Sequence, residues 1–121
     1  MGTAPASAAS YDLNTETTGA FGHGSVDFNS RTYLSSIHLR SVDTASDGHH
    51  VRIRLVTKRN DGTNAYWAWR ANYGGHGNQE EWYTSLSDAR GVKAILLQTC
   101  RAEGTTLLNC DNSPWRNNPY Y

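Results

Sequence analysis

Residues 50–73 read HVRIRLVTKRNDGTNAYWAWRANY, and this stretch decides the fold that we expect. Its first half alternates between apolar and polar side chains. Because successive side chains of a β-strand point to opposite faces, the alternation predicts a strand with one face in a core and the other facing water or a partner. The inward set is Val51, Ile53 and Leu55, and the outward set is Arg52 and Arg54.

The second half of this stretch predicts a hairpin followed by an aromatic strand. Asn60-Asp61-Gly62 is a strong turn signal, because Asn and Gly tolerate the positive φ of a primed turn. Beyond it, Trp67 and Trp69 share the less polar phase, which predicts that both point into the core. The alternative is an exposed platform in which these tryptophans, with Tyr73 and Trp82, stack on sugar rings.

Similar alternating runs, separated by Gly, Asn and Asp, continue along the chain. They predict an all-β protein, a single-domain antiparallel β-sandwich (immunoglobulin-like or similar) of about seven to eight strands with one disulfide. We expect residues 19–121 to form this domain. Residues 1–18 are expected to be a flexible or strand-donating segment, because the part from Ser10 to Thr18 contains few apolar residues. The expected strands are Tyr11–Thr17, Ser25–Phe28, Tyr33–Val42, His50–Arg59, Asn64–Tyr73, Glu80–Ser85, Gly91–Arg101 and Thr105–Cys110.

Charge and hydropathy exclude several classes of partner. The chain has 121 residues, with 11 Lys and Arg against 11 Asp and Glu. A net charge of zero provides no overall field to attract a polyanion, so we expect no nucleic-acid partner. No apolar run approaches the roughly 18 residues of a membrane span, so we expect no membrane insertion.

The two cysteines and the N-terminus indicate an oxidising compartment. Cys100 and Cys110 enclose a short loop, which predicts a disulfide between neighbouring strands, worth about 3 kcal/mol on the chain-entropy model. Residues 4–9 read APASAA, like the end of a secretory signal, although no apolar segment precedes them. The alternative is an ordinary disordered N-terminus. We therefore expect a secreted, extracellular protein.

No residue pattern indicates catalysis or a cofactor. The five histidines show no metal-ligand spacing, and the chain has no G-x-S-x-G motif. We therefore expect no catalytic residues, no metal and no cofactor. A small hydrolase or toxin using His49 and His50 is the weaker alternative. Asp43 and Asp47 favour Asx-type turns over a calcium site, because the closing Glu of an EF-hand is missing.

Three segments carry a family resemblance: Val42–Val56, the Trp-rich strand after it, and the run from Leu96 through Cys100 to Cys110. Together they resemble small secreted β-sandwich proteins of Streptomyces-type actinobacteria. Some of these are similar to the small adaptor subunit of umbrella-shaped antibacterial toxin particles. The resemblance implies a non-catalytic component of an assembly and assigns no individual site.

We therefore expect a secreted, non-catalytic protein-interaction or adaptor module, with an extracellular antibacterial toxin assembly as its suggested setting. A carbohydrate-binding module that uses exposed aromatics to hold a polysaccharide is the alternative. Arg and aromatic side chains dominate many interfaces, and this chain has more aromatics than a small core can hold. The expected partner-binding residues are Tyr11, Leu13, Arg52, Arg54, Arg70, Trp115 and Tyr120.

Overall fold

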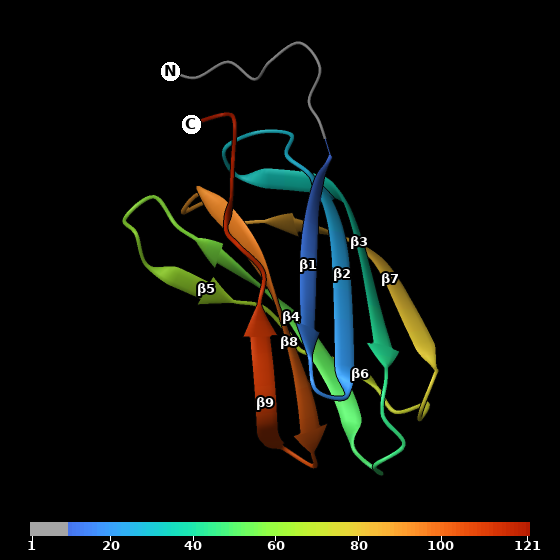
Figure 1. Cartoon of the computed structure of the whole chain (residues 1–121). Coiled ribbons are helices and arrows are strands. Elements are labelled where there is room, and N and C mark those ends of the chain that lie inside the picture. Colours follow the sequence, from blue (N-terminus) through green and yellow to red (C-terminus); the bar gives the residue numbers. More distant parts are fainter. Residues whose placement is uncertain (1–9) are drawn as a thin grey trace.

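Two antiparallel β-sheets lie face to face in the computed structural model, which describes residues 10–121 (Figure 1). The predicted secretory-signal remnant at residues 4–9 lies outside the described residues. The four-stranded sheet has the order β1-β2-β3-β7, made of β1 (Tyr11–Thr17), β2 (Ala20–Asp27), β3 (Tyr33–Asp43) and β7 (Gln79–Ser87).

The six-stranded sheet is built around two long central strands, β4 (His50–Lys58) and β8 (Ala94–Glu103). Two short strands, β5 (Asn64–Tyr66) and β6 (Arg70–Asn72), pair with β4 on one side. On the other side, β9 (Thr106–Asn112) and β10 (Arg116–Asn117) pair with β8. The predicted all-β sandwich is confirmed, with ten strands where about seven to eight were expected.

The core fills the space between the sheets. In the six-stranded sheet, Leu55 lies opposite Leu97 and both side chains point inward, as the alternation in β4 predicts. Opposite them, the four-stranded sheet contributes buried apolar side chains that include Leu13 of β1, Val26 of β2, Leu39 of β3 and Leu86 of β7. The largest fully buried apolar side chains are Leu13, Leu34, Ile37, Leu39, Ile53, Ile95, Leu97, Val26, Val51 and Val92.

A glycine in β2 allows the two sheets to approach closely. A Cβ atom on Gly22 would lie 2.0 Å from the Thr99 hydroxyl oxygen in the opposite sheet. Thr99 is hydrogen-bonded there to Thr15, with 2.6 Å between the two hydroxyl oxygens. The sequence pattern predicts that this strand starts at Ser25, because glycines in a strand interior weaken the alternation signal. The structure shows that the strand begins at Ala20.

The prediction that residues 1–18 form a flexible or strand-donating segment is wrong for Tyr11–Thr17. This strand pairs along its whole length with β2, and the Leu13 side chain is fully buried in the chain's own core. Side chains of the other sheet also cover the outer edge of β1. The backbone N–H of Glu16 donates to the Asp111 carboxylate (2.9 Å), and Arg116 Nε donates to the carbonyl of Asp12 (3.0 Å).

The predicted hairpin between β4 and β5 is present, although its turn differs from the primed type. Gly62 has a φ of 86°, and no residue other than glycine has positive φ in the described chain. Hydrogen bonds from Arg59 N to Thr63 O (2.8 Å) and from Gly62 N to Arg59 O (2.9 Å) close the loop. These features describe a three-residue loop in which glycine alone takes the left-handed position.

The predicted disulfide joins the two strands at one side of the six-stranded sheet. Cys100 in β8 and Cys110 in β9 are directly opposite in register, with their Cα atoms 4.1 Å apart. The bond is consistent with an extracellular protein, since disulfides persist in oxidising compartments.

Candidate functional site

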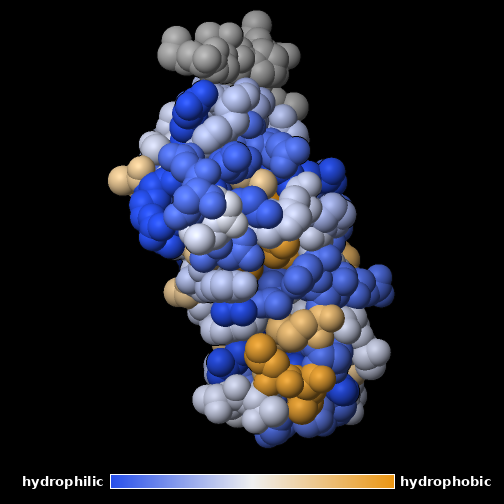
Figure 2. All heavy atoms as spheres, turned by 90° about the vertical axis from the view of Figure 1, so that its left-hand side faces the viewer, coloured by the Kyte–Doolittle hydropathy of each residue, from blue (hydrophilic) through white to orange (hydrophobic). Residues whose placement is uncertain are grey.

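The outer face of the six-stranded sheet carries the arginines that the sequence placed in the outward phase. Arg52 and Arg54 of β4 point away from the core, between inward neighbours that are fully or almost fully buried. Figure 2 looks onto the side of β5 and β9, and shows hydrophobic atoms near the middle and near the lower end, among hydrophilic ones. This outer face is the candidate functional site.

A one-residue bulge beside β4 separates the two tryptophans. Between the Val56↔Tyr66 and Ile53↔Arg70 pairs, β4 advances by three residues and its partner by four. A bulge of this kind reverses the alternation beyond it. The prediction that both tryptophans point inward is therefore confirmed for Trp67, which packs on the core, and wrong for Trp69.

Trp67 is held inside by its indole as well as by packing. Its Nε1–H donates a hydrogen bond of 2.9 Å to the hydroxyl of Thr57, which is fully buried. Its ring packs against the apolar cluster between the sheets. Trp67 therefore belongs to the core and is not available as a sugar platform.

Trp69, in contrast, contacts the guanidinium of Arg54 on the outer face. The Arg54 Cζ atom lies 4.1 Å from the centroid of the Trp69 ring and 4.6 Å from that of Tyr66. Arg54 Nε donates to the side-chain oxygen of Gln98 on β8 (2.7 Å). We refer to Arg54, Tyr66, Trp69 and Gln98 as the Arg54 cluster.

The environment of Arg54 immobilises its charge. Burial under the two rings lowers the pKa of the guanidinium, although the nearby Tyr66 opposes this shift. An arginine remains protonated at neutral pH in spite of such a shift. The cluster therefore presents a fixed cation, with one face of each aromatic ring already occupied.

Two further cations extend this face along β4. Lys58 Nζ lies 4.8 Å from the centroid of the Trp115 ring, and Arg52 donates to the backbone oxygen of Gly104 (2.8 Å). Within residues 10–121, none of Arg52, Arg54 and Lys58 has a carboxylate at ion-pair distance. The outer face is therefore cationic although the whole chain is neutral.

Apolar side chains complete the outer face. Val56 and Leu96 face each other across β4 and β8 and are almost completely buried beneath the surrounding side chains. Leu107 and Leu108, at the start of β9, are 40% and 41% exposed. The start of β9 lies at the lower end of the molecule in Figure 1. This mixture of apolar, aromatic and cationic groups is typical of a protein-binding surface.

Four of the predicted partner-binding residues lie elsewhere. Leu13 is in the core, and Tyr11 packs edge-on against the ring of Phe28, with centroids 5.6 Å apart. Tyr120 packs back onto the core of its own domain. Arg70 is opposite Ile53 in register, so the bulge turns its side chain to the inner side of the sheet. Its Cζ atom lies 6.0 Å from the centroid of the Trp82 ring. Of the other three, Arg52 and Arg54 lie on the outer face of β4, and Trp115 contacts Lys58 of the same strand.

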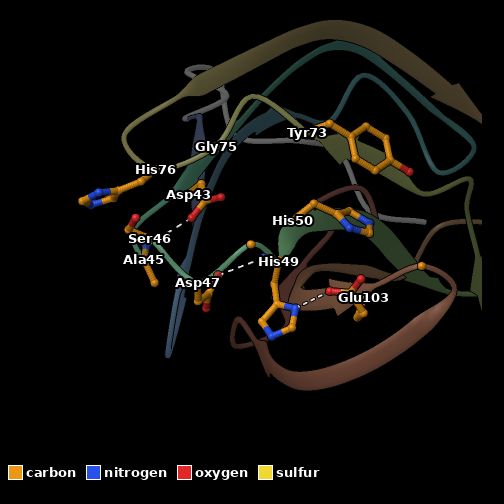
Figure 3. A pocket seen from close by; sticks show the side chains of 12 residues that line it. Asp43, Ala45, Ser46, Asp47, His49, His50, Tyr73, Gly75, His76 and Glu103 are labelled. Carbon is orange, nitrogen blue, oxygen red and sulfur yellow. Dashed lines mark hydrogen bonds and ion pairs between the residues drawn. The ribbon is translucent and has the colours of Figure 1, made fainter.

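A second feature, which sequence analysis did not identify, is a pocket of about 520 Å³ at one end of the sandwich. The β3–β4 loop, the β6–β7 loop and the β8–β9 turn surround it (Figure 3). Asp43 Oδ1 accepts from the N–H of Ala45 (3.1 Å), and Asp47 Oδ1 from the N–H of His49 (3.0 Å). These are the Asx-type turns that the sequence predicts.

Two of the histidines, His38 and His49, are paired with acidic residues that are distant in the sequence. His49 Nδ1 is hydrogen-bonded to Glu103, and His38 Nε2 lies 2.9 Å from Glu81. Both pairs join residues more than forty positions apart, so local sequence motifs contain no sign of them. Among the described residues, no group of three or more His, Cys, Asp or Glu side chains could hold a metal ion.

No protein-family model, curated protein or solved structure matches the chain. The resemblance to secreted actinobacterial proteins therefore stays a prediction. In residues 10–121, no helix is long and apolar enough to cross a membrane.

Proposed function

We propose that this protein is a secreted, non-catalytic interaction module that binds an acidic surface of a partner protein. The binding surface is the outer face of the six-stranded sheet. The partner contributes Asp or Glu carboxylates to Arg52, Arg54 and Lys58, and apolar side chains to the exposed Leu107 and Leu108.

The Arg54 cluster is the observation that carries this proposal. Gln98 and two aromatic rings hold the guanidinium in place, and no hydrogen bond within residues 10–121 occupies its two terminal nitrogens. Such a guanidinium loses little rotamer entropy when it binds, and its planar fork matches a carboxylate. Tyr, Trp and Arg are also the residues that contribute most often to the binding energy of protein interfaces.

Charge complementarity and ring geometry favour an acidic protein over a polysaccharide on this face. The cations lack carboxylate partners within the described chain, so an acidic surface would neutralise them. The rings of Tyr66 and Trp69 each have the Arg54 guanidinium against one face, so a ligand stacked on the other face would lie beside a fixed cation, which favours a carboxylate over a neutral sugar. Trp82 packs against the core and offers no such face on this side.

The predicted family resemblance extends the proposal to the setting of the protein. The partner would be another subunit of an extracellular assembly, in which this chain acts as an adaptor, and a toxin particle is the assembly that the resemblance suggests. The disulfide supports an oxidising compartment for such an assembly.

Zero-length cross-linking in the secretome of the producing cells tests the proposal. A carbodiimide joins a lysine amine to a carboxylate that touches it, and the chain has only two lysines, Lys58 and Lys93. We expect cross-links from Lys58 to Asp or Glu residues of a stoichiometric partner. We expect few from Lys93, which precedes β8 and serves as the internal control.

Arginine variants on the two sheets provide the matched comparison. Arg54→Ala should weaken binding to the captured partner by about 2 kcal/mol, roughly 30-fold, because it removes an anchored cation. Arg40→Ala, on the outer face of the four-stranded sheet, should leave the affinity unchanged. Equal losses in the two variants, or cross-links from Lys93 alone, would contradict the proposal.

A further inference from the structure

The pocket at the end of the sandwich is distinct from the Arg54 cluster and has its own chemistry. Its volume of about 520 Å³ is within the range of roughly 300–1,000 Å³ that is common for small-molecule sites. It is lined by one aromatic ring, three histidines and three carboxylates. Figure 3 shows Tyr73 and His50 on one side and Asp43, Asp47 and His76 on the other.

Tyr73 offers an open aromatic face at this pocket. Its side chain is 70% exposed, and one face of its ring rests on the His50 imidazole, with 4.4 Å between the centroids. His50 is itself buried, and its Nε2 accepts a hydrogen bond from Arg52 Nε (2.8 Å). This bond requires a neutral imidazole, and burial lowers the pKa of His50. A rigid, uncharged support therefore holds the exposed ring.

Asp43 supplies a buried hydrogen-bond acceptor beside this ring. Its side chain is almost completely buried, at 2% exposure, and Oδ1 is bonded to the N–H of Ala45. In Figure 3 the other carboxylate oxygen is turned towards the pocket. Within residues 10–121, Asp43 has no cationic partner, whereas Asp47 is paired with Arg101 and Glu103 with His49. A buried carboxylate of this kind needs a donor from a ligand or from water.

These features point to one class of ligand. Pyranose sugars have an apolar C–H face that stacks on an aromatic ring, and hydroxyl groups that donate to carboxylates. The unpaired charge of Asp43 disfavours sugars that carry a carboxylate of their own. We propose that the pocket binds a neutral pyranose, which stacks on Tyr73 and donates hydroxyl hydrogen bonds to Asp43.

Amide NMR shifts of the full chain, titrated with methyl glycosides of glucose, galactose and mannose, test this proposal. We expect at least one glycoside to bind with a dissociation constant of roughly 1 mM. The largest shifts should fall in the loops around Asp43, Tyr73 and Glu103. Glucuronate, which has the same ring but a negative charge, should bind more weakly than the matching glucoside.

Variants assign the binding to named groups. Tyr73→Ala should weaken glycoside binding by about tenfold or more, whereas Tyr73→Phe, which keeps the ring, should retain it. Asp43→Asn should weaken binding while the amide spectrum confirms the fold. Tyr66→Ala, which removes an exposed aromatic of the Arg54 cluster, is the control and should bind normally.

Three results would overturn the proposal. The first is the absence of localised shifts with all three glycosides. The second is shifts centred on the Arg54 cluster, or binding that Tyr73→Ala leaves intact. The third is a preference for a charged ligand. Stronger binding of glucuronate than of the glucoside would identify an anion site, and binding of tetramethylammonium but of no sugar would identify an organic-cation site. None of these results bears on the cross-linking test of the partner-binding face.

Discussion

The two outer faces of the sandwich use similar side chains in opposite ways. On the four-stranded sheet, His38 stacks on Tyr83 with 4.5 Å between centroids, and its Nε2 lies 2.9 Å from Glu81. His23 similarly lies 3.6 Å from Asp12. On the six-stranded sheet, Arg54 and Lys58 also contact aromatic rings, yet no carboxylate of residues 10–121 accompanies them. A chain with zero net charge therefore has one outer face on which charges are paired, on the four-stranded sheet, and one cationic face, which is the outer face of the six-stranded sheet.

The largest expected effect separates the interior from the cationic face. Trp67→Ala should lower the free energy of unfolding by about 3–5 kcal/mol, because it opens a cavity and leaves the buried Thr57 hydroxyl without its indole donor. Trp69→Ala should cost about 1 kcal/mol, because Trp69 packs mainly against Arg54. Urea denaturation measures both values. Equal losses of unfolding free energy in the two variants would mean that both rings are equally buried, which would contradict the assignment of Trp69 to the outer face.

The disulfide should stabilise the edge of the cationic face. Reducing the Cys100–Cys110 bond should lower the free energy of unfolding by about 3 kcal/mol on the chain-entropy model. Hydrogen exchange should become faster first in β9 and the adjoining part of β8. The strands of the four-stranded sheet should change less. Uniform acceleration across both sheets would show that the effect is global.

Arg54→Lys distinguishes geometry from charge on the cationic face. The variant keeps the positive charge but loses the planar fork that stacks on Trp69 and bonds to Gln98. We expect partner binding to weaken by about 1 kcal/mol, roughly fivefold, with the slope of affinity against salt concentration unchanged. Wild-type affinity in this variant, measured by calorimetry, would mean that charge alone is sufficient.

The smallest expected effect is a pH dependence at the end of the cationic face. Burial, together with the Arg52 charge, lowers the pKa of His50 below its ordinary value of 6.5. The unfolded chain then binds this proton more readily than the folded chain. The stability contributed by neutral His50 is therefore present above pH 6.5, and is lost as the pH falls through the folded-state pKa. His50→Gln should reduce the slope of unfolding free energy between pH 7 and pH 5, and an unchanged slope would exclude His50 as its source.

Sequence patterns predicted the fold better than the site. The alternation of apolar and polar residues is visible within one strand, whereas the pairing of residues between strands is not. The strand Tyr11–Thr17 and the inward set of β4 follow directly from period-two patterns, and the structure confirms both. The same reasoning placed Arg70 outward and Trp69 inward, because it assumed an unbroken strand across the bulge. Ala68 gives no local signal of that irregularity.

The pocket was missed for a different reason. Its residues come from three loops that the two sheets bring to one end of the molecule, and only the three-dimensional arrangement places His49 beside Glu103. His38 and His49 show no local pairing motif because their carboxylate partners, Glu81 and Glu103, lie on other strands. A pattern search within one segment finds turn residues such as Asp43 and Asp47, but it does not show what they face.

The bulge beside β4 has a consequence for how the length of the chain can change. The segment between Tyr66 and Arg70 has one residue more than regular pairing needs, and both flanking strands remain paired to β4. Deletion of the Ala68 codon would restore strict alternation and leave Trp67 inward and Trp69 outward, because Trp69 would still directly precede the inward Arg70. In this architecture a single-residue insertion or deletion can therefore be absorbed between two short strands in one genetic step, while the core and the outer face both keep their side chains.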